Sequence, residues 1–163
     1  MSAVLVEAGP DKGAVWHFGE PVKEQRALEA GTAWADLSHH NIIGVSGVDR
    51  LKWLHDLTTQ FVSDLQPGVW MANMILDAKG HVEFQFNVVD DGSTTFLVLD
   101  PGYSEQLIEY LTKMKFMLRV DVKDASSEFA VLRAPGAPTE IGGPFALVPR
   151  SEVEEMKKTF GGV

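Results

Sequence analysis

Polar and apolar residues alternate along residues 81–89, which is the pattern of a β-strand with one buried face. The polar face carries His81, Glu83, Gln85 and Asn87, and the apolar face carries Val82, Phe84, Phe86 and Val88. Antiparallel sheets commonly leave one face in solvent, so a solvated surface is one interpretation of the polar face. Glutamine, asparagine and histidine are unusual on a merely solubilising strand, so the floor of a polar pocket is the other interpretation.

Two more strands are expected beside this one. They cover 69–76 and 94–99, and short turns at 77–80 and 90–92 connect them to it. Gly80 closes the first turn, at a position that requires a positive φ. Strands joined by such short turns pair with their neighbours, so the sequence predicts a three-stranded antiparallel meander.

Apolar residues spaced three or four apart predict four helices. They are expected over 22–30, over about three turns from a capping box at 46–49, from Asp100-Pro101 to Met114, and after a second box at 151–154. The apolar stripe of the second helix is Leu51, Leu54, Leu57 and Phe61. Helices combined with hairpin strands indicate an α+β fold, an antiparallel sheet with packed helices.

Composition excludes several classes of function. The net charge is -9 and the basic residues are scattered, which argues against direct nucleic-acid binding. The absence of cysteine excludes disulfides, thiolate metal sites and cysteine nucleophiles. No apolar run reaches the roughly 18 residues that span a bilayer, and the first residues lack the features of a secretory signal. We therefore expect a cytoplasmic protein without a membrane partner.

The remaining polar clusters give no catalytic or metal site at this stage. His39 and His40 are adjacent, and neighbours on an extended segment point to opposite faces, so we expect no metal there. A set drawn from Ser46, His55 and Asp56 lacks the spacing of a hydrolase triad. The sequence therefore predicts no catalytic residues and no metal-ligating residues.

An ordered set of segments resembles a known family. The segments are Asp36-Leu-Ser-His39, Gly44-Val-Ser-Gly47-Val-Asp-Arg-Leu51, Leu57-Thr-Thr-Gln60, Asp77-Ala-Lys-Gly80 and Lys115-Phe-Met-Leu-Arg-Val120. Together they resemble the N-terminal domain of the glycine-cleavage T-protein (aminomethyltransferase) superfamily. The last two segments are similar to those of its folate-binding YgfZ-type members, including actinobacterial ones.

This resemblance implies a tetrahydrofolate site in a cavity shared between domains. The aspartate that the transferases place near the reactive folate nitrogen falls at Gln85, an aromatic residue falls at Ala72, and a folate-contacting position falls at His40. Asn73 and Asn87 complete the candidate cofactor-binding residues. Glutamine can hydrogen-bond a pterin but cannot take the electrostatic or proton-transfer role of a carboxylate.

The resemblance also implies that further domains complete the site. YgfZ-type proteins carry a downstream Lys-Gly-Cys motif, which this sequence does not contain. We therefore expect an N-terminal part, with a folate-binding domain over 1–133 and the truncated start of a second subdomain over 134–163. The missing C-terminal domains of the same protein would be its partners.

Three functional hypotheses stay open. The first is a YgfZ-type folate-binding protein that is not a transferase and supports iron–sulfur enzymes and tRNA modification. The second is an aminomethyltransferase that moves a one-carbon unit on tetrahydrofolate. The third is an interaction domain without a ligand, whose exposed interdomain face would drive self-association.

Overall fold

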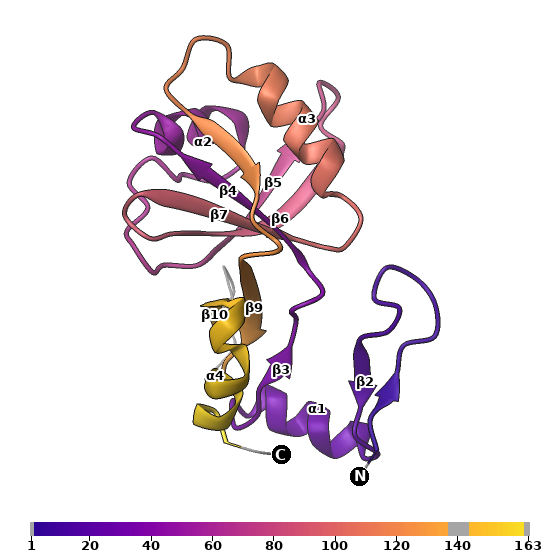
Figure 1. Ribbon diagram of the computed structural model, residues 1–163. Coiled ribbons are helices and arrows are strands. Elements are labelled where there is room, and N and C mark those ends of the chain that lie inside the picture. Colours follow the sequence, from indigo (N-terminus) through magenta and orange to yellow (C-terminus); the bar gives the residue numbers. More distant parts are fainter. Residues whose placement is uncertain (1, 137–143, 162–163) are drawn as a thin grey trace. The chain divides into compact units, whose positions relative to one another are not determined.

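The protein divides into two compact units, seen in a computed structural model that describes residues 2–136 and 144–161 (Figure 1). The sheet unit comprises residues 41–126. The terminal unit combines the described residues of 1–40 and 127–163. Each unit is described by itself below.

The sheet unit is built on a five-stranded antiparallel sheet in the order β5-β6-β7-β4-β8. The strands are β4 (Asn41–Ser46), β5 (Met71–Leu76), β6 (Val82–Asp90), β7 (Thr94–Leu99) and β8 (Asp121–Asp124). The meander predicted from the alternating pattern is confirmed as β5–β6–β7. The predicted α+β class is likewise confirmed.

Two helices, α2 (Arg50–Leu57) and α3 (Ser104–Met114), contribute to the main core of this unit. Trp53 and Leu54 of α2 and Leu107 and Leu111 of α3 are buried against strand residues such as Phe86. Each fully buried side chain of this size contributes about 1.5–3 kcal/mol to folding. This core holds β5 and β6 in register, with their other face left for polar residues.

The predicted alternation along β6 holds over most of the strand and fails at its start. Ile75 pairs with Phe84 and Leu76 pairs with Val82, so Glu83 is an extra residue on β6. Such a bulge shifts the faces of the residues before it. Val82, predicted to be buried, is 54% exposed as a result.

The predicted capping box at 46–49 is wrong. Ser46 is the last residue of β4, where it pairs with strands on both sides, so it does not cap a helix. The carboxylate of Asp49 instead accepts hydrogen bonds from Arg119. Helix α2 is 8 residues long and ends at Leu57, shorter than predicted, and Phe61 lies outside it with 63% of its surface exposed.

The helix expected to open at Asp100-Pro101 begins later, at Ser104. Residues 101 and 102 form a turn instead, and the Gly102 amide donates to Asn41 Oδ1 at 2.9 Å. The centre of this helix faces the core, because Leu107 and Leu111 are fully buried.

The terminal unit contains two small sheets and two helices. Its elements are β1 (Val4–Leu5), β2 (Val15–His17), α1 (Pro21–Glu29), β3 (Ala35–Asp36), β9 (Phe129–Arg133), β10 (Phe145–Pro149), the single 3₁₀ turn η1 (Arg150–Glu152) and α4 (Val153–Thr159). One sheet pairs β1 with β2, and the other has the order β10-β9-β3. The second predicted capping box is absent, because α4 begins without a side-chain cap after the 3₁₀ turn.

The sequence predicted a domain boundary after residue 133, whereas the compact units of the structure divide the chain after residues 40 and 126. β9 ends at Arg133, which pairs with Phe145 of β10, so the strands on both sides of the expected boundary form one hairpin. Most of the proline- and glycine-rich stretch over 134–144 lies outside the described residues. Among the described helices, none has the length and apolar character needed to cross a bilayer.

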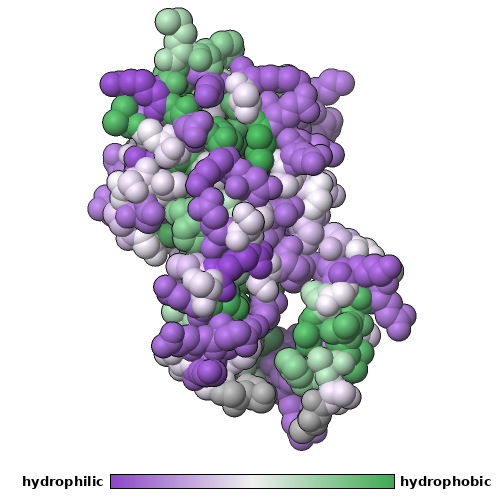
Figure 2. All heavy atoms as spheres, viewed as in Figure 1, coloured by the Kyte–Doolittle hydropathy of each residue, from purple (hydrophilic) through white to green (hydrophobic). Residues whose placement is uncertain are grey.

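Hydrophobic side chains gather on the surface over the β1–β2 hairpin and α1 (Figure 2). Val4, Leu5, Val15 and Trp16 of the hairpin are 40%, 49%, 42% and 70% exposed. Helix α1 buries none of its residues fully. The hairpin and α1 therefore belong to a loosely packed part of the terminal unit.

Candidate functional site

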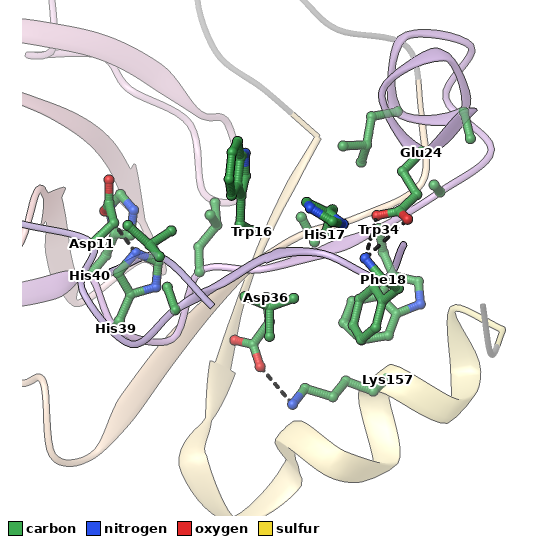
Figure 3. Close-up of a pocket in the computed structure, with 18 of the residues that line it drawn as sticks. Asp11, Trp16, His17, Phe18, Glu24, Trp34, Asp36, His39, His40 and Lys157 are labelled. Atoms are coloured by element: carbon green, nitrogen blue, oxygen red, sulfur yellow. Dashed lines mark hydrogen bonds and ion pairs between the residues drawn. The ribbon is translucent and has the colours of Figure 1, made fainter. Parts of the chain in front are cut away.

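The terminal unit encloses a cavity of about 520 Å³. Its walls come from the β1–β2 hairpin, from α1 and from residues 32–40, with Lys157 of α4 (Figure 3). Trp16, Phe18 and Trp34 give it aromatic surface. The volume lies within the about 300–1,000 Å³ that is usual for small-molecule pockets.

A tight turn over residues 36–40 carries the polar end of this cavity. Asp36 Oδ1 accepts hydrogen bonds from the amide and hydroxyl of Ser38, and the His40 amide donates to the Leu37 carbonyl at 2.9 Å. Lys157 Nζ lies 2.6 Å from Asp36 Oδ2. Burial alone would raise the pKa of Asp36, but the hydrogen bonds from Lys157 and Ser38 lower this pKa overall. The turn is therefore held by an ionised carboxylate.

His39 and His40 lie next to one another on this turn. Their ring centroids are 4.7 Å apart at an angle of 68°, and His39 Nε2 lies 3.0 Å from Asp11 Oδ1. From the sequence, this segment was predicted to be extended, with the two rings on opposite faces. That premise is wrong, because the segment is a turn that brings both rings and Asp11 together.

The predicted polar face of β6 forms a second candidate site, in the sheet unit. Gln85 lies opposite Met74, and Asn87 lies opposite Ala72, on the face of β5 and β6 away from Phe86 and the helices. A groove of about 200 Å³ runs past Gln85 and is also lined by Tyr103, which was not among the predicted site residues. The structure thus brings Ala72, Gln85 and Asn87 onto one face.

Asn73 lies on the opposite face from these three residues and is only 2% exposed. Its side-chain amide donates to Thr58 Oγ1 at 2.8 Å, and its carbonyl oxygen accepts from Thr59 Oγ1 and the Gln60 amide. These bonds tie the end of α2 to β5. The structure does not bring Asn73 to the candidate pocket floor, since adjacent strand residues point to opposite faces.

His40 belongs to the terminal unit, whereas Ala72, Gln85 and Asn87 belong to the sheet unit. Each group therefore has its own local setting, the 520 Å³ cavity for His40 and the 200 Å³ groove for Gln85. The other cavity residues were missed because they come from segments near both ends of the chain that share no motif. Tyr103 was missed because no sequence motif includes it.

The weak Ser46–His55–Asp56 alternative has no geometry to support it. The ring of His55 packs against Phe61, with centroids 4.7 Å apart, and Asp56 pairs with Lys52. Ser46 is held in the strand ladder. These three residues therefore have separate local roles.

Comparison with known proteins identifies the fold. No protein-family model matches the sequence. The structure is similar to a crystal structure of the glycine cleavage system aminomethyltransferase T from Bartonella henselae, with a TM-score of 0.64 and 16% sequence identity. The match covers 80% of this chain and 36% of that chain, so this chain spans well under half of the protein it resembles. The chain therefore has the fold of part of a glycine-cleavage T-protein.

Proposed function

We propose that this chain is a tetrahydrofolate-binding domain of YgfZ type, which supports iron–sulfur enzymes and tRNA modification in the cytoplasm and is not itself a transferase. The observation that carries the proposal is the placement of Gln85, Asn87 and Ala72 on one accessible face of a T-protein-like sheet. The fold is observed, and the ligand and the cellular role are proposed from it.

The chemistry of this face suits a pterin ring. The Gln85 side chain is exposed and offers one carbonyl acceptor and two amide donors, and half-buried Asn87 offers the same groups. Tyr103 lines the groove beside Gln85 and can add an aromatic surface or a hydroxyl. Since amides do not ionise, this site can bind and orient the ring without exchanging a proton with it.

The groove is too small for a whole folate. Its volume of about 200 Å³ is below that of usual small-molecule sites, so it fits one edge of the ligand. We propose that further domains of the same protein supply the remaining contacts. Asn73 is then a positioning residue, which holds β5 from the opposite face.

A titration of the full-length protein and of this chain with tetrahydrofolate tests the proposal. Calorimetry should show saturable binding to the full-length protein, weakened at least about tenfold by Gln85→Ala or Asn87→Ala, because each loses hydrogen bonds to a buried polar ligand. Gln106→Ala is the matched control, as Gln106 is an exposed glutamine on α3. Absence of binding by the full-length protein would refute the proposal.

A second candidate is aminomethyl transfer, the activity named for the structurally similar protein. It requires a group that can take the place of the transferase aspartate at Gln85. If the native protein transfers a one-carbon unit to tetrahydrofolate and Gln85→Ala abolishes that activity, this candidate replaces the first. Activity that arises only in Gln85→Asp would instead indicate a folate site that lacks its carboxylate.

A further inference from the structure

We propose that Asp11, His39 and His40 form a binding site for one divalent transition-metal ion, with zinc as the probe of choice. Each residue offers one ligand atom, and the three atoms lie within 4.8 Å of one another. The side chains lie side by side at one end of the terminal cavity (Figure 3).

The distances fit a shared ion after small side-chain adjustments. Zinc binds imidazole nitrogen and carboxylate oxygen at about 2.0–2.2 Å, so two ligand atoms on one tetrahedral ion lie about 3.4 Å apart. His39 Nε2 and Asp11 Oδ1 are already 3.0 Å apart. A movement of about 1 Å, available to surface side chains through rotamer changes, brings all three atoms to one ion.

The backbone that carries the two histidines is fixed before any metal binds. Asp36 closes the turn from one side through Ser38, and Arg150 Nη2 donates to the Ser38 carbonyl at 2.8 Å. Asp36 is itself held by Lys157. Because these partners restrain the turn, binding an ion costs little ordering of the backbone.

Asp11 reaches the histidines from the loop of the β1–β2 hairpin. Hydrogen bonds of 2.9 Å from the Gly13 amide to the Val6 carbonyl and from the Ala14 amide to the Asp11 carbonyl shape this loop. Asp11 is 51% exposed and His39 is 27% exposed at the side chain. The carboxylate can thus move to an ion without disturbing a packed core.

The donor set selects the class of metal. Two imidazoles and one carboxylate favour zinc, cobalt or nickel over magnesium and calcium, which prefer oxygen ligands. Three protein ligands leave a position for water or for a ligand group, as in zinc sites with an open coordination position. His39, His40 and Asp11 all line the cavity, so that position would be accessible from it.

A second histidine–aspartate pair in this chain provides an internal control. His81 Nδ1 lies 3.0 Å from Asp77 Oδ2, the same separation as in the His39–Asp11 pair. Among the described residues, the only group of three or more metal-ligating side chains is the one at His39. A simple histidine–aspartate pair should bind zinc weakly, whereas the three-residue site should bind it tightly.

Calorimetric titration of the chain, without an affinity tag, with zinc chloride tests the inference. We expect one saturable site per chain and at least a tenfold loss of affinity in His39→Ala and in His40→Ala, because each variant removes an ion ligand. Asp11→Asn should also weaken zinc binding. Because Asp11 is exposed, this substitution should not unfold the protein, so unfolding would not account for the loss. His81→Ala should bind zinc like the unmodified chain.

Cobalt gives a spectroscopic readout of the same site. Bound Co²⁺ should show visible absorption bands of a tetrahedral complex, lost in His39→Ala and kept in His81→Ala. Absence of saturable zinc binding, or equal losses in His39→Ala and His81→Ala, would overturn the inference. Neither titration contains folate, so failure of this inference and failure of the proposed folate function can be told apart.

Discussion

The sheet unit and the terminal unit place their buried surface differently. The main core of the sheet unit has fourteen buried hydrophobic residues, contributed by its strands, its two helices and their loops. A core cluster of the terminal unit, counted over the described residues, has four, on β9, β10 and α4. Yet the terminal unit holds a cavity of about 520 Å³, and the sheet unit a groove of about 200 Å³.

This difference follows from how each unit covers its strands. In the sheet unit, α3 buries Leu107 and Leu111 in the main core, and partly buried apolar residues of the helix pack against that core. In the terminal unit, α1 buries no residue fully and β1–β2 is a short pair of strands. Loose covering leaves both a cavity and exposed aromatic side chains. The contrast teaches that stability should depend most on the sheet unit, and space for a ligand on the terminal unit.

The largest loss of stability should come from the buried ion pair of the sheet unit. Asp90 accepts two hydrogen bonds of 2.9 Å from Arg50 and one of 2.6 Å from Thr95, and its side chain is 2% exposed. Asp90→Ala leaves the guanidinium without its partner, which costs about 3–5 kcal/mol in comparable buried pairs. Urea unfolding measures this loss. Glu109→Gln, in an exposed pair with Lys113, is the control and should leave stability unchanged.

The same carboxylate makes stability depend on pH. Burial alone would raise the pKa of Asp90, but hydrogen bonds from Arg50, Thr95 and Gly92 lower this pKa overall. The unfolded chain, with an aspartate pKa of about 3.9, therefore takes up a proton at higher pH than the folded protein. This contribution is present above about pH 4 and is lost as the pH falls toward the folded pKa. Asp90→Asn should flatten that acid limb of the urea midpoint; an unchanged limb would contradict the assignment.

A matched pair of core substitutions compares the two units directly. Leu111 of α3 and Leu132 of β9 are both fully buried. Leu→Ala at such sites costs about 2–5 kcal/mol, and the cost grows with the cavity that remains. We expect the larger loss at Leu111, because its crowded core cannot collapse around the missing atoms. Hydrogen exchange should speed up over 41–126 in Leu111→Ala and around β9–β10 in Leu132→Ala.

Leu118→Ala is the control for this pair, since Leu118 is 42% exposed. Its effect on the free energy of unfolding should stay within about 0.5 kcal/mol. If Leu132→Ala proves more costly than Leu111→Ala, the terminal unit is the more tightly packed of the two. The contrast between the units would then be wrong.

The sequence predicted what short-range pattern controls. The strand over 94–99 was predicted with the bounds of β7, and the turn closed by Gly80 has the expected positive φ of 85°. The capping box at 46–49 failed because the sheet ladder, a long-range interaction, holds Ser46 in a strand. Local patterns therefore predict elements well where no distant partner competes for the same residue.

The candidate site residues also fall into those that local patterns predict and those that long-range contacts position. The strand period placed Gln85 and Asn87 on one face, and the structure agrees. The turn that brings His39 and His40 together could not be predicted, because Lys157 and Arg150 support it from more than a hundred residues away. Asn73 was a candidate cofactor-binding residue together with Ala72, but adjacent residues of β5 point to opposite faces.

Asn73 gives a smaller test of which face carries which role. Its side chain satisfies Thr58, Thr59 and the Gln60 amide. Asn73→Ala removes these hydrogen bonds of a buried side chain and should cost about 1–3 kcal/mol of unfolding free energy. Thermal unfolding followed by circular dichroism measures the change. The folate affinity of the variant, corrected for its unfolded fraction, should equal that of the unmodified protein. A loss of affinity that remains after this correction would place Asn73 in the site.

The smallest expected effect on stability is that of Gln85→Ala, and it is the most informative about the sheet unit. Gln85 is exposed, and its exchange for alanine should change the free energy of unfolding by no more than about 0.5 kcal/mol. The same variant should lose folate affinity in the full-length protein. Asn73 and Gln85 would then separate completely, one acting on stability and the other on binding, from opposite faces of the same pair of strands. A stability loss in Gln85→Ala as large as that in Asn73→Ala would show instead that protein contacts hold the polar face of β6. Gln85 would then have a structural role, and it would no longer support a ligand in the groove.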